Sequence, residues 1–205
     1  MDSVKRIFVE KKAPFAVKAK ELKTEIESYL GIHSVTAVRE FIRYDMENIS
    51  ADIFEAACEK VFSEPPVDIL YHETIDIPED GRVFSVEYLP GQFDQRAASA
   101  VDCVRLIDPS AQVSIKSSKL IILPADTTDE TIDKIKKYYI NAVESREKDL
   151  AKLTAMEQPE VTPVPVLEGL TALTDEELAP YCKKMGLAMN ADDLREVVNY
   201  FKAEG

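Results

Sequence analysis

The first 78 residues show two hydrophobic rhythms, one that repeats every second residue and one that repeats every three to four. Period-two alternation predicts strands, and a spacing near 3.6 predicts helices. Strands are therefore expected over residues 4–12, 38–46 and 67–75, with the long middle run bent into a hairpin at Arg39–Glu40. Helices are expected from Pro14 to Gly31, and from an N-cap at Ser50 to Pro65. The predicted order is β-α-β-β-α-β.

The same pattern restarts after the turn at residues 79–81. Strands are expected over 83–89 and 142–147, and residues 113–123 predict a hairpin that turns at Ser117–Ser118. Helices are expected after the N-caps Asp94 and Thr128. The order of elements is again β-α-β-β-α-β.

The two halves correspond position by position, which predicts an internal duplication. The matching pairs are Ile7 and Phe84, and Val9 and Val86, at a separation of 77, then Phe15 and Phe93, Ala19 and Ala97, Ile26 and Val104, Val35 and Val113, Phe54 and Ile132, and Ser50 and Thr128 at 78. We expect an α+β fold made of a tandem pair of ferredoxin-like βαββαβ units. Each sheet would carry helices on one face only, and its open face would pack on the other copy, forming a covalent pseudo-dimer.

Beyond residue 150 the character of the chain changes. The duplicated α+β domain is expected over residues 1–150, with halves of about 1–78 and 82–150. Pro159, Pro163 and Pro165 predict an extended linker over 151–172. Residues 173–205 predict a helical hairpin that opens with a capping box at Thr174–Glu177. Two short helices bury little surface alone, so this hairpin is expected to dock on a partner.

Composition narrows the classes of function. The formal net charge is −13, which disfavours nucleic-acid binding because that requires an excess of Lys and Arg. No apolar stretch is long enough for a membrane span or a signal peptide, so we expect a cytoplasmic protein without a membrane partner. Cys58 and Cys103 lie among Ala and Val, which is typical of buried structural thiols. His33 and His72 have no ligand neighbours at metal-binding spacing, so no metal site is expected.

The sequence contains none of the short motifs that commonly carry chemistry. It has six glycines, and none forms a phosphate-binding loop. Neither G-x-S-x-G nor H-E-x-x-H occurs. We therefore expect no catalytic residue and no cofactor site in this chain.

Residues 90–96 are the candidate interaction site. Pro90–Gly91 is a turn dipeptide and Asp94 is a helix N-cap, so one interpretation is a simple turn and cap. The corresponding loop of the first half, residues 12–17, lacks the polar groups that follow Gly91. The alternative is a surface that docks another domain, made of Gln92, Phe93, Asp94, Gln95 and Arg96.

The stretches L-P-G-Q-F-D-Q-R-A at 89–97 and N-A-V-E-S-R-E at 141–147 resemble the N-terminal region of the large single-chain phosphoribosylformylglycinamidine synthases of purine biosynthesis. The run L-T-D-E-E-L at 173–178 is similar to the linker region of that family. The resemblance implies a domain similar to a fused dimer of the small subunit that multi-subunit versions of the enzyme use. It agrees with the duplication predicted above.

Enzymes of this family are ligases that use glutamine, ATP and Mg to convert formylglycinamide ribonucleotide to its amidine. The resemblance implies that the catalytic domains of these enzymes lie C-terminal to the region that this chain resembles. This chain alone is therefore expected to be inactive. Its implied role is a scaffold that brings the synthetase and glutaminase domains together and helps to form the ammonia route. The isolated chain is expected to be monomeric or weakly self-associating.

Two other functions compete with the scaffold. Paired ferredoxin-like units can hold a small molecule between them, which would make the chain a regulatory module. An independent enzyme is disfavoured, because no nucleophile, base or metal cluster can be assembled from the sequence.

Overall fold

The structure is a computed structural model, and it describes residues 4–77, 81–151, 153, 155–156 and 166–204. The chain divides into two units, Met1–Pro159 and Glu160–Gly205, and each is described by itself. The first unit is an α+β domain and the second is helical.

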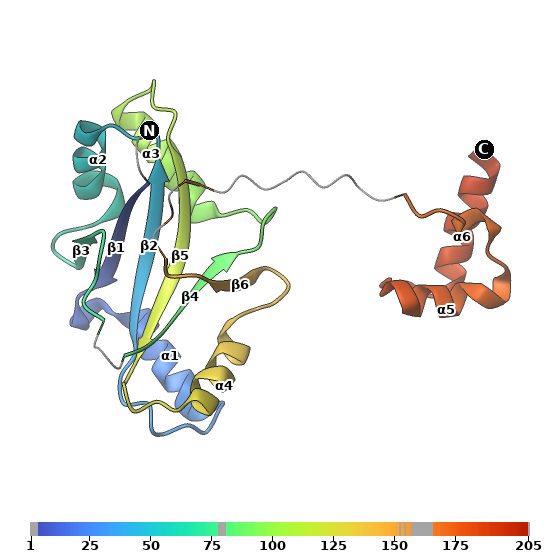
Figure 1. The fold of residues 1–205 in the computed structure, drawn as a ribbon, viewed down its shortest axis with the longest axis horizontal. Coiled ribbons are helices and arrows are strands. Elements are labelled where there is room, and N and C mark those ends of the chain that lie inside the picture. Colours follow the sequence, from blue (N-terminus) through green and yellow to red (C-terminus); the bar gives the residue numbers. More distant parts are fainter. Residues whose placement is uncertain (1–3, 78–80, 152, 154, 157–165, 205) are drawn as a thin grey trace. The chain divides into compact units, whose positions relative to one another are not determined.

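The first unit is built on one six-stranded antiparallel sheet with the order β3-β1-β2-β5-β4-β6 (Figure 1). Its strands are β1 (Lys5–Lys11), β2 (Arg39–Glu47), β3 (Asp68–His72), β4 (Arg82–Tyr88), β5 (Ser114–Leu123) and β6 (Ser145–Lys148). Its helices are α1 (Val17–Ser28), α2 (Ala51–Ala57), α3 (Gln95–Ile107) and α4 (Asp129–Tyr139). A 3-10 turn, Ala13–Phe15, precedes α1, and a π-helical turn, Cys58–Phe62, follows α2.

Neither predicted hairpin forms, so each half reads β-α-β-α-β. β2 begins at Arg39 and continues without a break to Glu47, and β5 runs without a break through Ser117–Ser118. The two strands pair with each other along almost their full length, from Arg39 opposite Ile122 to Glu47 opposite Ser114. This ladder holds the predicted turn residues extended, and neither sequence contains the Asn-Gly or Asp-Gly pair that favours a tight hairpin.

The two halves of the domain share this sheet. The first half contributes β3, β1 and β2, and the second half contributes β5, β4 and β6, joined at the β2–β5 pair. The expectation that the open faces of two separate sheets pack on each other is therefore wrong. The halves associate through strand edges, which satisfies backbone hydrogen bonds that isolated edges would leave unpaired.

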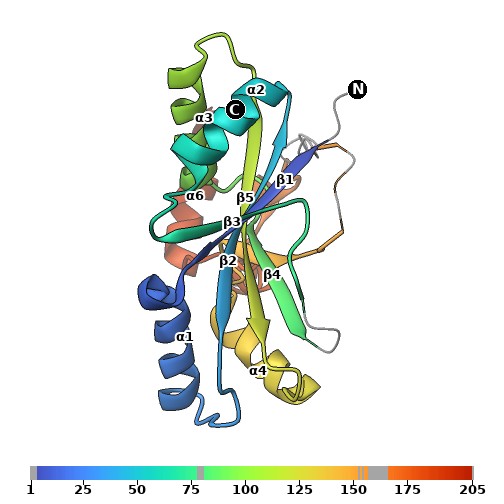
Figure 2. The ribbon, with the colours of Figure 1, turned by 90° about the vertical axis from the view of Figure 1, so that its left-hand side faces the viewer.

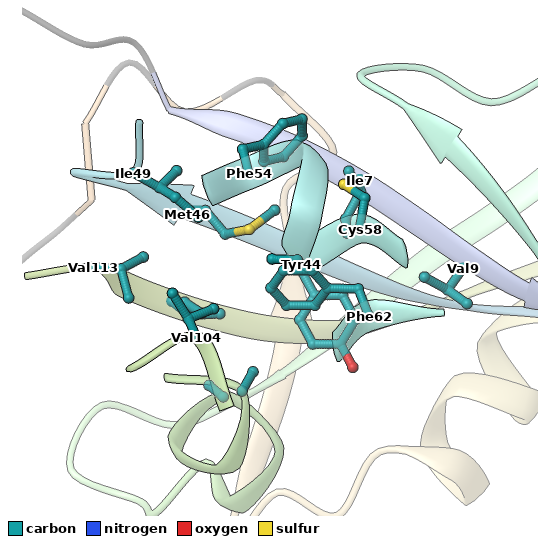
Figure 3. Packing of buried hydrophobic residues seen from close by; sticks show 14 residues of the cluster. Ile7, Val9, Tyr44, Met46, Ile49, Phe54, Cys58, Phe62, Val104 and Val113 are labelled. Atoms are coloured by element: carbon teal, nitrogen blue, oxygen red, sulfur yellow. The ribbon is translucent and has the colours of Figure 1, made fainter. Parts of the chain in front are cut away.

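The four helices cover one face of the sheet in two groups, and each group takes one helix from each half (Figure 2). α2 and α3 pack over one end, where Phe54 and Val104 meet Ile7 and Met46 (Figure 3). α1 and α4 pack over the other end, where their side chains meet those of β4 and β5. Buried residues of this second group are Leu22, Ile26, Val35, Phe84, Val86, Ile121, Leu123, Ile132 and Ile135. The halves are thus interleaved, and neither completes its core alone.

The face of the sheet without helices carries a buried group of charges. Arg6 Nε donates to Asp45 Oδ1 at 2.6 Å, and Arg43 Nε donates to Asp45 Oδ2 at 2.8 Å. The same two guanidinium groups donate to the main-chain carbonyls of residues 149–151 at 2.9–3.0 Å. The segment that follows β6 is therefore anchored across this face. Apolar residues of this face, Phe8, Phe41, Leu120 and Ile122, are also buried.

The strand registers of the two halves are related by a constant shift. Adding 77 to the paired residues Lys5 and Met46 gives Arg82 and Leu123, which are also paired. Adding 77 to Phe8 and Tyr71 gives Ser85 and Lys148, again a pair. The starts of α1 and α2 map onto those of α3 and α4 with a shift of 78.

The second unit is a helical hairpin of α5 (Asp175–Met185) and α6 (Ala191–Glu204), preceded by a 3-10 turn, Leu170–Ala172. The predicted capping box at Thr174–Glu177 is confirmed, and Gly186 adopts a φ of 64° at the end of α5. Leu178, Cys182, Leu194 and Val198 form its buried core. The predicted linker prolines Pro159, Pro163 and Pro165 lie outside the described residues.

Candidate functional site

The loop after β4 is shaped by a tight turn and a helix cap. The Gln92 N–H donates to the Leu89 carbonyl at 3.0 Å, and Gly91 at the turn has a φ of 91°, a region that favours glycine. Asp94 then caps α3 by accepting from the Ala97 N–H at 2.9 Å, as predicted. The loop therefore leaves the sheet and enters the helix within six residues.

The Asp94 carboxylate also ties α3 to the middle of β5. Its Oδ2 accepts from the Ser117 N–H at 2.8 Å, and its Oδ1 accepts from the Ser117 hydroxyl at 2.9 Å. These bonds form where the pairing of β4 with β5 has ended, beyond Val86 opposite Lys119. Asp94 takes the place of a strand partner there, so its carboxylate is used inside the fold.

The two stretches that resemble the amidotransferase family lie side by side. The Leu89 N–H donates to the Glu144 carbonyl at 2.9 Å, and Gln92 Nε2 donates to the Val143 carbonyl at 3.5 Å. A turn at residues 141–145, closed by Ser145 N–H donating to the Asn141 carbonyl, presents these groups. Segments about 50 residues apart in sequence thus form one surface.

Two large apolar side chains project from this surface. Phe93 is 74% exposed and Val143 is 80% exposed. Tyr88, at the end of β4, is 45% exposed. We call Phe93, Val143 and Tyr88 the loop patch. Burial of such side chains is the main favourable contribution to protein association.

Gln95 and Arg96 take a different direction from Phe93, because they line a central cavity of about 610 Å³. The cavity lies on the helix-covered face, over the middle of the sheet. A second cavity of about 250 Å³ adjoins it, and Ile42, Tyr44 and Arg96 line both. The five residues predicted as one docking site therefore divide: Gln92 and Phe93 lie in the loop patch region, Asp94 is structural, and Gln95 and Arg96 belong to the cavity.

The floor of the cavity is polar because β5 places polar residues, and not apolar ones, on its helix-facing side there. Side chains two residues apart share a face of a strand. Ile115 packs under the α2–α3 group and Ile121 under the α1–α4 group, and Ser117 and Lys119 are the positions between them on that face. Lys119 is exposed although β5 is a central strand. The helix groups leave Lys119 uncovered, and Ser117 is half-buried and bonded to Asp94.

Charged groups converge on the cavity. Arg96 Nη1 donates to the Tyr44 hydroxyl at 3.5 Å, and Lys119 Nζ lies 5.7 Å from the centre of the Tyr139 ring. Burial raises the pKa of Glu40, against the opposing effect of Lys119, Lys18 and Arg96. Burial, with a smaller contribution from Glu40, also raises the pKa of Tyr139, so that its phenol is neutral at physiological pH.

Sequence reasoning missed Ser117, Lys119, Glu40, Tyr44 and Tyr139 as site residues. The error follows from the predicted hairpin. It placed Ser117 in a turn, so its side chain was not assigned to the helix-covered face of the sheet. With β5 taken as one strand, Ser117 and Lys119 fall between apolar residues that face the helices. Polar side chains at core-facing positions were the available signal.

The cysteines differ from each other. Cys58 is buried and its pKa is raised to about 11 by burial, which agrees with a structural thiol. Cys103 is exposed and lines the central cavity, so the prediction that it is buried is wrong. The reason is that Cys103 lies beside the uncovered middle of the sheet, away from the core packing of α3.

Neither a metal site nor a membrane helix is found in the part of the chain that the structure describes. No three His, Cys, Asp or Glu side chains there are grouped so that they could hold an ion. Among the described helices, none combines the length and apolar character that a bilayer span requires.

Comparisons with known proteins do not identify a family. Neither the family models nor the curated protein sequences contain a match to this chain.

Proposed function

We propose that this chain is the non-catalytic assembly portion of a phosphoribosylformylglycinamidine synthase-type amidotransferase. Its role is to hold a synthetase domain and a glutaminase domain together and to help form the route for ammonia between them. The chain supplies no ATP or Mg site of its own in this proposal, and it acts in the cytoplasm. Its partners are the two catalytic domains.

The observation that carries the proposal is the convergence of the two family-like stretches. Residues 89–97 and 141–147 carry the resemblance to that family, and hydrogen bonds from Leu89 and Gln92 bring them together. The surface they form presents Phe93 and Val143 to solvent. A local structural role does not require exposed apolar side chains at these positions, whereas docking of another domain does.

The architecture supports the finer proposal of a duplicated, ferredoxin-like pseudo-dimer. The constant shift of 77 between strand pairs and of 78 between helix starts is what a tandem repeat would produce. The β2–β5 pair then corresponds to the joint between two subunits. The interleaved helix groups are equivalent to the contacts that two separate copies would exchange.

Binding to separately produced catalytic domains tests the proposal. The 205-residue chain would be immobilised, and the synthetase–glutaminase portion of a single-chain family member would be passed over it. We expect saturable binding, and we expect the double variant Phe93→Ser, Val143→Ser to weaken it at least about tenfold, because apolar anchors dominate such interfaces.

A matched control is available on α3. Leu106 is 85% exposed and lies outside the loop patch, so Leu106→Ser removes a comparable apolar side chain without the predicted effect. Absence of binding to the catalytic domains would contradict the assembly function. Equal weakening by Leu106→Ser and by the double variant would contradict the assigned surface.

The regulatory alternative also has an observation in its favour, which is the central cavity between the helix groups. The two functions are compatible in one chain, because Phe93 and Val143 are exposed and do not line the cavity, whereas Tyr88 belongs to both the loop patch and the cavity wall.

A further inference from the structure

The central cavity lies where a domain of this size normally packs its core. Residues of β2, β4, β5, α3 and α4 line it, and about 610 Å³ is left open between the α2–α3 group and the α1–α4 group. Pockets of this volume are in the range that binds small molecules. The position, in the middle of a sheet, gives the cavity a rigid floor.

Two cations meet in this cavity without a carboxylate at ion-pair distance. Among the described residues, no salt bridge involves Arg96 or Lys119, although most Arg side chains of the domain are paired with Asp or Glu. Arg96 makes one long hydrogen bond, to Tyr44, and Lys119 faces the Tyr139 ring. In a chain of net charge −13, such free cations indicate a site for an external anion.

Among the described residues, none of the acidic groups near the cavity forms an ion pair with these two cations. Glu87 on the wall is already paired, with Arg146 at 2.8 Å and with Lys148. Glu144 contributes to the rim and is exposed. Glu40 is the carboxylate that acts on Arg96 and Lys119 electrostatically.

Neutral donors complete the site. The Gln95 amide and the neutral Tyr139 phenol line the cavity, whereas the Ser117 hydroxyl there already donates to Asp94 Oδ1 at 2.9 Å. Carboxylates and phosphates are recognised by this combination of a planar guanidinium, an ammonium and neutral donors. Ile42 and Val86 on the floor provide contact for an apolar or planar part of the same molecule.

We propose that the central cavity binds a small molecule with a phosphate or carboxylate group, with Arg96 and Lys119 as the residues that pair with its charge. The site does not rest on the assembly function proposed above, since none of its residues belongs to the docking pair Phe93 and Val143. The turn and the helix cap do not account for Arg96, and the proposed anion site gives this residue a role.

Isothermal titration calorimetry and amide chemical-shift mapping of the 205-residue chain test this site. The probes are inorganic phosphate, AMP with adenosine as its uncharged match, and glutarate with its diamide. We expect at least one anion to bind saturably and to shift the amides of Tyr44, Ser117 and Lys119. Its uncharged match should bind at least about tenfold more weakly, because a charge-assisted hydrogen bond is lost.

Variants then test whether Arg96 and Lys119 are the cations that bind the anion. Arg96→Gln and Lys119→Gln should each weaken binding about tenfold or more, and Lys119→Arg should retain most of it. Both side chains are exposed, so the variants are expected to fold, which their amide spectra would verify. The controls are Arg105→Gln on the same helix and Lys137→Gln on α4, which make the same charge change outside the cavity.

The pattern of probes identifies the ligand chemistry. Binding of phosphate and AMP alone indicates a phosphate compound, and binding of glutarate alone indicates a carboxylate compound. Absence of saturable binding by any anion up to about 10 mM would overturn the proposal. Binding that Arg96→Gln and Lys119→Gln leave unchanged would also overturn it, since the anion would then lie elsewhere. Neither result bears on docking through the loop patch.

Discussion

Asp45 is the residue on which the helix-free face of the sheet depends. It lies between Arg6 and Arg43, and the side chains of all three are at most 4% exposed. Burial lowers the pKa of Arg43, and Asp45 opposes that effect because its carboxylate is the counter-charge of the buried guanidinium. The same two arginines hold the carbonyls of residues 149–151.

Replacement of Asp45 by Asn should therefore be strongly destabilising. The change leaves two buried cations without a counter-charge, and loss of one partner from a buried ion pair costs about 3–5 kcal/mol. Urea unfolding followed by circular dichroism would measure the free energy of unfolding. Glu21→Gln is the control, because its pair with Lys18 is exposed to solvent and should contribute little to stability. Similar losses in the free energy of unfolding for the two variants would show that the buried ion pairs of Asp45 stabilise the fold no more than an exposed pair does.

For Glu40 we expect the free energy of unfolding to change with pH in the direction opposite to that of a carboxylate in an ordinary ion pair. Its pKa is raised by burial, so the folded state holds its proton to higher pH than the unfolded chain does. Stability is then lost as pH rises from the ordinary value of 4.5 through the raised value. Glu40→Gln should accordingly raise the free energy of unfolding at neutral pH, and this gain should vanish below pH 4.5.

Glu130 offers a control of reversed sign for this measurement. Its hydrogen bond with Lys134 lowers its pKa, so Glu130→Gln should lower stability at neutral pH and have no effect in acid. Urea unfolding over about pH 3 to 7 would compare the variants. A loss of stability at neutral pH on Glu40→Gln would show that Arg96 and Lys119 outweigh burial at this position.

At the scale of elements, α3 and β5 are joined by one carboxylate. Asp94 caps the helix and also receives the N–H and hydroxyl of Ser117, at a place where β5 has lost its β4 partner. The strand can therefore remain extended through Ser117 and Ser118. This contact explains why a serine pair that looks like a turn lies inside a ten-residue strand.

Asp94→Ala should lower the free energy of unfolding by more than the loss of an ordinary helix N-cap does. Loss of the cap and of the charged partner of Ser117 together should lower the free energy of unfolding by about 2–4 kcal/mol. Ser50→Ala on α2 removes a single cap bond, to the Ile53 N–H, and should cost about 0.5–1 kcal/mol. Thermal and urea unfolding would compare them, and equal costs would mean that the bonds to Ser117 add nothing.

At the scale of the whole molecule, the architecture of the first unit follows from the β2–β5 pair. Once the two long strands pair, each half lies beside the other in one sheet, and α1 reaches the strands of the second half. The helix groups separate over the middle of that sheet and leave the cavity. A site for a small anion thus arises at the joint between the halves, where the sequence of neither half suggests one.

The caps show how far the sequence alone could predict this fold. Ser50, Asp94, Thr128 and the Thr174–Glu177 box were all predicted and are all formed, because each is made by residues within one turn of helix. The α+β class followed from hydrophobic periodicity. The candidate loop was found as well, since its turn and cap are local signals.

The hairpins and most of the cavity could not be predicted in that way. Ser117 and Ser118 are compatible with either a turn or a strand, and the choice depends on Tyr44 and Asp94, which are far away in sequence. Cys103 has the neighbours of a buried residue and is exposed because no helix covers the adjacent sheet.

The sequence by itself determined the positions of the helices and their caps, because these depend on residues close together in the chain. The tertiary structure alone decided the pairing of β2 with β5, the exchange of helices between halves, the burial of Asp45 between two arginines, and the convergence of Arg96 with Lys119. Each of these joins residues that are distant in sequence or on different elements. Their energies come from packing and from the exclusion of water, which exist only once the chain has folded.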